Sequence, residues 1–229
     1  MIRSLSRTFG VVLLLVLSPL VAGAQSMLTA SEFLANVAAN YATIEDYTAT
    51  MVWTDETGTM RGALLYKRPN MIRIDFTQPK DQVIVSNGRV LQIYIPAVNV
   101  VLRQDLRGST ATVPGGLATA EGLALLRRNY TVAYLEGPEP VPFSPDSPEL
   151  VTRLRLDSRQ TTEAFRRLIL SVDSEGLIRR IEGTRIDWSE VRMTLSDIRV
   201  NQRLSDQTFE YTPDPSASIS ENFLTNPEG

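Results

Sequence analysis

Residues 62–94 read GALLYKRPNMIRIDFTQPKDQVIVSNGRVLQIY, and this stretch decides the fold. Over residues 71–77, large apolar side chains alternate with polar ones such as Arg73 and Asp75, which is the period of a strand with one buried face. Asn87-Gly88 then separates two further strand-like runs, and Asn-Gly is the strongest short signal for a hairpin with a type I′ turn. The stretch therefore predicts consecutive antiparallel strands.

The same pattern continues on both sides of this stretch. Strand-like runs follow one another at short spacing, without the alternating helices that a parallel sheet requires. We expect a mainly β protein with helices (α+β), and its sheet of about ten or eleven antiparallel strands is large enough to curl or close. The expected strands are 47–54, 60–67, 71–77, 82–86, 89–95, 98–103, 130–135, 150–157, 165–172, 177–184 and 191–200, with a last short one at 208–211.

Two or three helices are expected beside the sheet, and two of them can be placed. Thr29 to Glu32 has the form of a capping box, and the apolar residues after it repeat at helical spacing, which predicts a helix over residues 29–44. A shorter helix is expected within residues 119–128, where leucines cluster. Residues 137–148 contain five prolines, and we interpret them as a long hairpin connection rather than a domain boundary.

The beginning of the chain has the pattern of an export signal. Two arginines precede an apolar run, and Ala22-Gly23-Ala24 has the small side chains of a cleavage site, so we expect residues 1–24 to be removed. The alternative is an uncleaved membrane anchor. Ser18-Pro19 argues against it, because it interrupts the run before it reaches the ~20 apolar residues that a membrane span needs. We therefore expect a soluble periplasmic protein.

The composition excludes several classes of protein. The 229 residues include no cysteine and no histidine, which removes disulfides, zinc fingers, Cys nucleophiles and Ser-His-Asp triads. A formal net charge of −3 argues against nucleic-acid binding, and no glycine-rich phosphate motif occurs. We expect a protein that is not an enzyme, with no catalytic residue, no metal and no cofactor. Its length fits a single domain, which we place over residues 25–213, followed by a poorly ordered tail over 214–229.

The hairpin around Asn87 has large apolar side chains on both of its faces. Val83 and Val85 lie on one face of the first strand and Ile84 on the other, and the second strand repeats this. Two explanations remain open. Either both faces of the sheet are covered, with helices on one side, or one face lines an apolar cavity that is open to a ligand.

Several motifs in this region resemble the periplasmic outer-membrane lipoprotein carrier (LolA-like) family. That family has a strand ending in Lys-Arg-Pro-Asn or Lys-Arg-Pro-Gly, then a Gln-Pro, then a strand–Asp/Asn-Gly–strand hairpin that ends in Trp-x-Tyr. Here Lys67 to Asn70, Gln78-Pro79 and the Asn87-Gly88 hairpin match in order, and Gln92 stands where the family has Trp. Tyr94-Ile95-Pro96 matches the Tyr-x-Pro that follows.

The resemblance implies an unclosed antiparallel β-barrel whose open side is covered by helices that act as a lid. It also implies a cavity for the acyl chains of lipoprotein cargo. The partners it implies are an inner-membrane ABC transporter complex that delivers the cargo, and an outer-membrane lipoprotein acceptor or the outer membrane itself. We expect the carrier to be a monomer.

The resemblance points to one site residue in particular. The arginine of the family's Lys-Arg-Pro motif holds the lid by hydrogen bonds to helix and loop backbone, and Arg68 matches it. The alternative is that Arg68 is a solvated residue at a strand end. From the periodicity of the strand and helix faces, we expect the apolar wall of the cavity to include Phe33, Val37, Tyr41, Ile72, Ile74, Ile93, Leu123 and Leu126.

Three other functions share the expected fold or compartment. The first is a periplasmic lipid-sensing regulator that acts on a membrane-bound signalling partner. The second is an outer-membrane acceptor of lipoproteins, which the absence of a cysteine for lipid anchoring disfavours. The third is an enzyme acting on envelope lipid.

Overall fold

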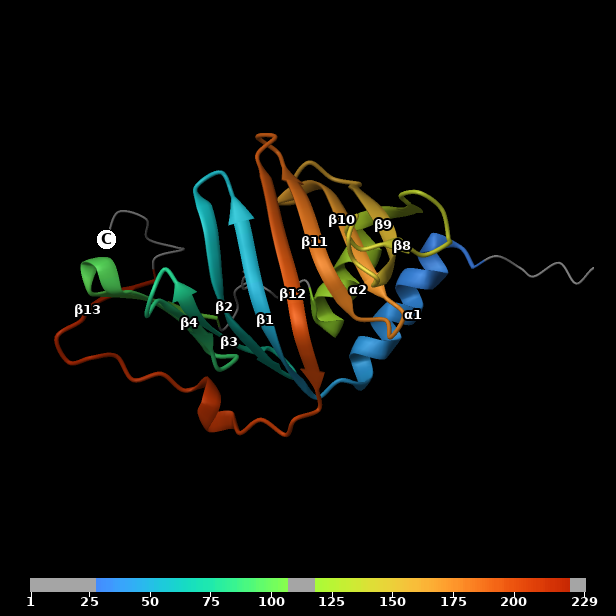
Figure 1. Ribbon diagram of the computed structural model, residues 1–229. Helices are drawn as coiled ribbons and strands as arrows, with labels where there is room; N and C mark the ends of the chain where they lie inside the picture. The colour runs from blue at the N-terminus through green and yellow to red at the C-terminus, as the bar shows by residue number, and fades with distance from the viewer. Residues whose placement is uncertain (1–27, 107–117, 223–229) are drawn as a thin grey trace, which may run out of the picture.

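A computed structural model describes residues 28–106 and 118–222, and within them the strands form one sheet of 13 (Figure 1). Its order is β13-β6-β5-β4-β3-β2-β1-β12-β11-β10-β9-β7, and β8 pairs with β9 beside this path. The strands are β1 (Asp46–Asp55), β2 (Gly58–Lys67), β3 (Met71–Gln78), β4 (Val83–Ser86), β5 (Val90–Ile95), β6 (Val100–Asp105), β7 (Tyr130–Tyr134), β8 (Val141–Pro142), β9 (Leu150–Ser158), β10 (Phe165–Asp173), β11 (Ile178–Arg185), β12 (Glu190–Val200) and β13 (Ser218–Glu221).

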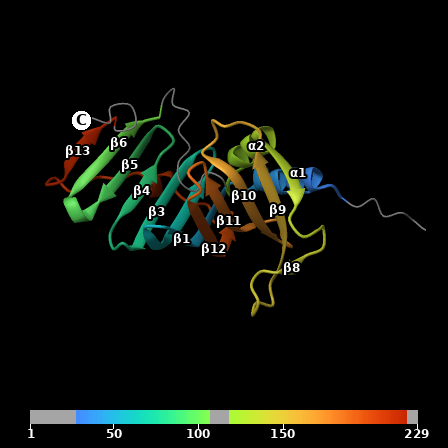
Figure 2. The ribbon, with the colours of Figure 1, turned by 90° about the horizontal axis from the view of Figure 1, so that it is seen from above.

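The sheet is unclosed, because β13 and β7 end the order without pairing with each other. The helices are α1 (Ala30–Thr43) and α2 (Ala120–Asn129), with short 3₁₀ turns η1 (Pro96–Val98) and η3 (Asp206–Phe209). Figure 2 shows the sheet curling, with α1 and α2 close together near β9 and β10. The expected fold, an open antiparallel sheet covered by helices, is confirmed. None of the helices in the described part of the chain is long and apolar enough to cross a membrane.

The structure differs from the sequence expectation near the end of the chain. The strand expected at 208–211 is wrong, because residues 206–209 form η3, whose start is capped by the Ser205 side chain accepting a hydrogen bond from Gln207 N. The expectation of a poorly ordered tail over 214–229 is also wrong in part. Residues 218–221 form β13, which pairs in parallel with β6. Residues 223–229, like 1–27, lie outside the described residues.

The Asn87-Gly88 hairpin is confirmed, but its turn is not type I′. β4 and β5 pair antiparallel from Ser86↔Leu91 onwards. Of the two central residues, only Gly88 has a positive φ, at 84°. The Asn87 side chain closes the turn instead, because its Oδ1 accepts hydrogen bonds from Arg89 N and Val90 N, both at 3.0 Å. The asparagine therefore acts through its side chain rather than through a left-handed backbone.

Gly62 of β2 lies against the backbone of β3, beside a register shift between Arg61 and Gly62. A Cβ at this position would lie 2.5 Å from the Asp75 carbonyl oxygen, which belongs to rigid backbone. We therefore expect Gly62→Ala to lower the free energy of unfolding by about 1–3 kcal/mol, because the two strands must separate to admit the methyl group. Urea unfolding followed by circular dichroism measures this. A loss below about 0.5 kcal/mol would show that the strands yield without cost.

The main core lies between the inner face of the sheet and the two helices. The expected capping box starts α1, with Glu32 N donating to Thr29 Oγ1 at 3.2 Å and Thr29 N donating to Glu32 Oε2 at 2.9 Å. The buried face of α1 carries Leu34, Val37 and Tyr41, and that of α2 carries leucines. These side chains and those of the inward-facing strand positions form one continuous apolar cluster.

Residues 201–217, which we name the C-terminal strap, connect β12 to β13 and are bonded to the outer face of β2, β3 and β5 (Figure 1). Three outward-facing side chains hold the strap by donating to its carbonyl oxygens: Lys67 Nζ to Leu204 at 2.6 Å, Arg73 Nη1 to Thr208 at 3.0 Å and Gln92 Nε2 to Tyr211 at 3.3 Å. Phe209 of the strap and Val85 of β4 are each 1% exposed. The two apolar faces of the hairpin are thus both covered, one by the core under the helices and one by the strap. Gln92 is thus one of three side chains that hold this strap.

Candidate functional site

The eight residues expected to line an acyl cavity belong to the apolar cluster between the sheet and the two helices, or pack against it. Six of them are 0–4% exposed members of the core cluster, and Phe33 and Ile93 are partly buried and pack against it. They are part of one apolar interior between the sheet and the two helices. A ligand that enters this interior must therefore displace helix side chains from the sheet.

Arg68 follows the end of β2 and contacts the end of α1. Its Nη1 donates to the carbonyl oxygen of Ala42, in the last turn of the helix, at 2.5 Å. The same atom lies 3.4 Å from Glu45 Oε1, and the side chain is 37% exposed. A guanidinium at a helix C-terminus is favourable because the last carbonyls lack partners within the helix and carry partial negative charge. Arg68 is thus in place to hold α1 against the sheet, by one helix carbonyl and the Glu45 side chain.

Three buried tyrosines make further polar contacts around the interior, and two of them were not expected from the sequence. Tyr41 of α1 accepts a hydrogen bond at its hydroxyl from Ile178 N at 3.0 Å. Tyr47 donates to the Ala118 carbonyl oxygen, just before α2, at 3.0 Å, and the Tyr66 hydroxyl lies 3.2 Å from Glu121 Oε2 in the first turn of α2. The alternation of β1 and β2 places Tyr47 and Tyr66 on the inner face, but only the folded chain shows which helix residues they meet.

Ionising these tyrosines should unfold the protein. Burial raises the pKa of Tyr41, Tyr47 and Tyr66 above the ordinary value of 10. The unfolded chain therefore loses these protons first, so stability is present below pH 10 and falls above it, by about 1.4 kcal/mol per pH unit for each tyrosine kept neutral. We expect phenolate absorbance at alkaline pH to rise for these three only together with loss of circular dichroism. Their ionisation near pH 10 in protein that is still folded would contradict this.

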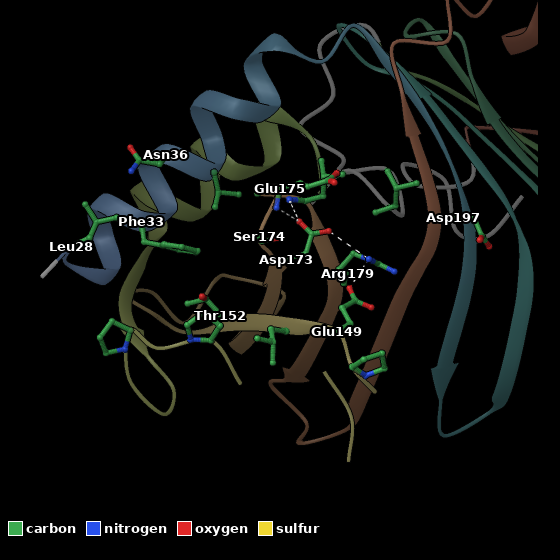
Figure 3. A pocket seen from close by; sticks show the side chains of 18 residues that line it. Leu28, Phe33, Asn36, Glu149, Thr152, Asp173, Ser174, Glu175, Arg179 and Asp197 are labelled. Atoms are coloured by element: carbon green, nitrogen blue, oxygen red, sulfur yellow. Dashed lines mark hydrogen bonds and ion pairs between the residues drawn. The ribbon is translucent and has the colours of Figure 1, made fainter. Parts of the chain in front are cut away.

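A separate pocket of about 1090 Å³ lies at the edge of the helical cover. We name it the lid-edge pocket; α1, the proline-rich connection, the start of β9, the β10–β11 turn and the end of β12 surround it (Figure 3). Of the eight expected residues, only Phe33 and Val37 line it. The sequence predicted the proline-rich residues as a connection between strands, which β7 and β9 confirm by pairing, but it did not indicate that their prolines form a pocket wall.

Polar groups in the lid-edge pocket are arranged around Arg179. Its Nη1 lies 2.5 Å from Glu149 Oε1 and 3.5 Å from Asp173 Oδ2 (Figure 3). No group of three or more acidic side chains within residues 28–106 and 118–222 is placed to hold a metal ion.

An open antiparallel sheet, with two helices covering an apolar interior, defines the class of unclosed β-barrels with a helical lid. The chain belongs to the family described as outer membrane lipoprotein carrier protein LolA, whose family model matches residues 48–212. This match includes residues 67–96, which carry the motifs of the sequence resemblance.

Individual relatives agree with this assignment. The outer-membrane lipoprotein carrier protein of Haemophilus influenzae is 26% identical over 160 residues, which cover 70% of each chain. The carrier protein of Serratia proteamaculans is 24% identical over 160 residues, with the same coverage. A crystal structure of an uncharacterized conserved protein from Thermus thermophilus superposes with a TM-score of 0.55 at 11% identity, over 84% of this chain and 98% of that one, and shows the fold alone.

Proposed function

We propose that this protein is a periplasmic carrier that binds the acyl chains of lipoproteins between the inner face of its sheet and helices α1 and α2. The observation that carries the proposal is that all eight expected residues belong to, or pack against, one apolar cluster between the sheet and the helices. Membership of the LolA family and the names of the relatives support it. Binding an acyl chain requires apolar surface and movement of the lid, but no catalytic group.

The closed interior gives a physical reason for reversible carriage. Each buried methylene contributes about 0.8 kcal/mol, so several acyl chains in a permanently open cavity would be held too tightly to release. Here cargo must displace Leu123, Leu126 and the α1 side chains, which are fully or almost fully buried without it. This competition lowers the apparent affinity, because part of the binding free energy is used to open the lid.

The carrier receives its cargo from an inner-membrane ABC transporter and delivers it to the outer membrane, through an acceptor protein or directly. The names of the relatives support an outer-membrane destination for the cargo. The donor transporter supplies the energy for lid opening. This is consistent with the absence of a nucleotide-binding motif from the sequence of the carrier. Arg68 acts in this cycle as the latch on α1.

Native mass spectrometry of the protein purified from the periplasm tests the proposal. Cells produce it together with a lipoprotein, or with the same lipoprotein lacking its acylated cysteine. We expect the triacylated protein to co-purify at a 1:1 ratio and the unacylated one to be absent. Bound free lipid or glycolipid without any lipoprotein would overturn carriage and favour a lipid-sensing regulator.

A further inference from the structure

The sheet opens between two neighbouring strands at the lid-edge pocket. β12 pairs with β1 as far as Val200, apart from a bulge at Asp197 and Ile198, but it pairs with β11 only from Glu190 to Thr194. Residues 195–200 of β12 therefore have a strand edge without a ladder partner on the β11 side. At the point where the pairing ends, a side chain replaces the backbone partner: Arg179 Nε donates to the Leu195 carbonyl oxygen at 3.1 Å. An extended polypeptide can add to an open edge of this kind through backbone hydrogen bonds.

The pocket beside this edge shares a wall with the apolar interior. Phe33, Val37, Leu177 and Ile198 line the pocket and also belong to the core cluster or pack against it. Phe33 extends from α1 into the pocket (Figure 3). Its ring packs edge-on against Tyr134, with 6.1 Å between the ring centroids. A chain that leaves the interior beside the N-terminal half of α1 enters this pocket directly.

The walls and charge of the pocket define what it can hold. Proline rings and the half-exposed side chain of Leu150 supply apolar surface. Four carboxylates line the pocket with one cation, Arg179, which pairs with Glu149 and Asp173. Within the described residues, Glu175 and Asp197 form no ion pair. The charge therefore favours an uncharged or basic segment and disfavours an acidic one.

We propose that the lid-edge pocket binds the polypeptide of the cargo, in extended form along the open edge of β12, where it follows the acylated residue out of the interior. This inference rests on the proposed function, because it places the acyl chains under the lid. It adds a second subsite, which recognises the peptide part of a lipoprotein rather than its lipid.

Binding of synthetic triacylated peptides tests the inference, with all ligands sharing the same acyl part. One has two residues, and three have twelve residues with a neutral, a lysine-containing or a glutamate-containing extension. We expect the neutral and lysine-containing extensions to lower the Kd about tenfold relative to the two-residue ligand, and the glutamate-containing one to give a smaller gain.

Two matched variants locate the effect. Leu150→Lys changes a 51% exposed side chain in the pocket, and Ile186→Lys changes a 57% exposed one at the β11–β12 turn, so neither disturbs the core. We expect the ratio of the two-residue to the lysine-extended Kd to fall severalfold in Leu150→Lys and to stay at the wild-type value in Ile186→Lys.

The outcomes separate the two proposals. Equal Kd values for the short and extended ligands, or an unchanged ratio in Leu150→Lys, would overturn the peptide subsite while leaving acyl binding intact. Failure of the two-residue triacylated ligand to bind at all would overturn the proposed function, and the peptide subsite with it.

Discussion

A disulfide between residues 40 and 176 is expected to block acyl uptake, with at least about a tenfold loss in the oxidised protein. A Cβ at Gly176 lies 3.8 Å from the Asn40 Cβ, which is the mean spacing across a disulfide. The bond joins α1 to the β10–β11 turn, where Asn40 Nδ2 already donates to the Glu175 carbonyl oxygen at 3.0 Å. Because acyl chains must displace α1 side chains, fixing the helix in place should prevent their entry.

The chain suits this experiment because it contains no other cysteine. A cysteine at residue 176 is strained, since Gly176 has a φ of 75°, but the strain is the same in both redox states. The comparison is therefore between oxidised and reduced samples of the N40C/G176C variant, with the two single variants as controls. We expect uptake to return on reduction, and equal uptake in both states would show that α1 stays in place while cargo enters.

Arg68→Leu is expected to have the opposite effect and to hold cargo about tenfold more tightly. The substitution removes the hydrogen bond to the Ala42 carbonyl oxygen and the ion pair with Glu45. At a partly exposed site these contacts stabilise the closed lid by about 1–2 kcal/mol, and a less stable closed state competes less with cargo. Kd for a triacylated peptide should therefore fall, and transfer to acceptor membranes should slow.

Arg68→Lys separates charge from geometry. Lysine keeps the positive charge but lacks the planar fork, so we expect an intermediate Kd. Unchanged Kd and transfer rate in Arg68→Leu, with Arg68→Lys also equal to wild type, would show that Arg68 does not latch the lid.

The interior could be predicted from the sequence because local periodicity determines it. Ile72 and Ile74 face inward by strand alternation, and Val37 and Tyr41 share one helix face, so each assignment needs only neighbouring residues. Arg68 was identified by resemblance alone, and the structure supplies its partner on α1. The sequence pattern therefore predicted which faces are buried.

The features that could not be predicted depend on contacts between distant segments. Phe209 packs against the outer face of the sheet in a segment that Arg73 and Gln92 hold by donating to its carbonyl oxygens. Each of these hydrogen bonds joins residues more than a hundred positions apart in the chain. β13 is short and polar apart from Ile219, so its pairing with β6 has no local signal. The lid-edge pocket likewise depends on where β11 stops pairing with β12, which is a matter of strand register rather than of composition.

Mapping the bound acyl chain tests the central claim most directly. A triacylated peptide with a photoreactive diazirine in one acyl chain is bound to the unmodified protein and irradiated, and the labelled residues are identified by mass spectrometry. We expect labels on the inner faces of β3 to β5 and on α1 and α2, at or beside Ile74, Ile93 and Leu123. Labels confined to the C-terminal strap, or to lid-edge residues outside α1 such as Leu150, would contradict an acyl site under the lid.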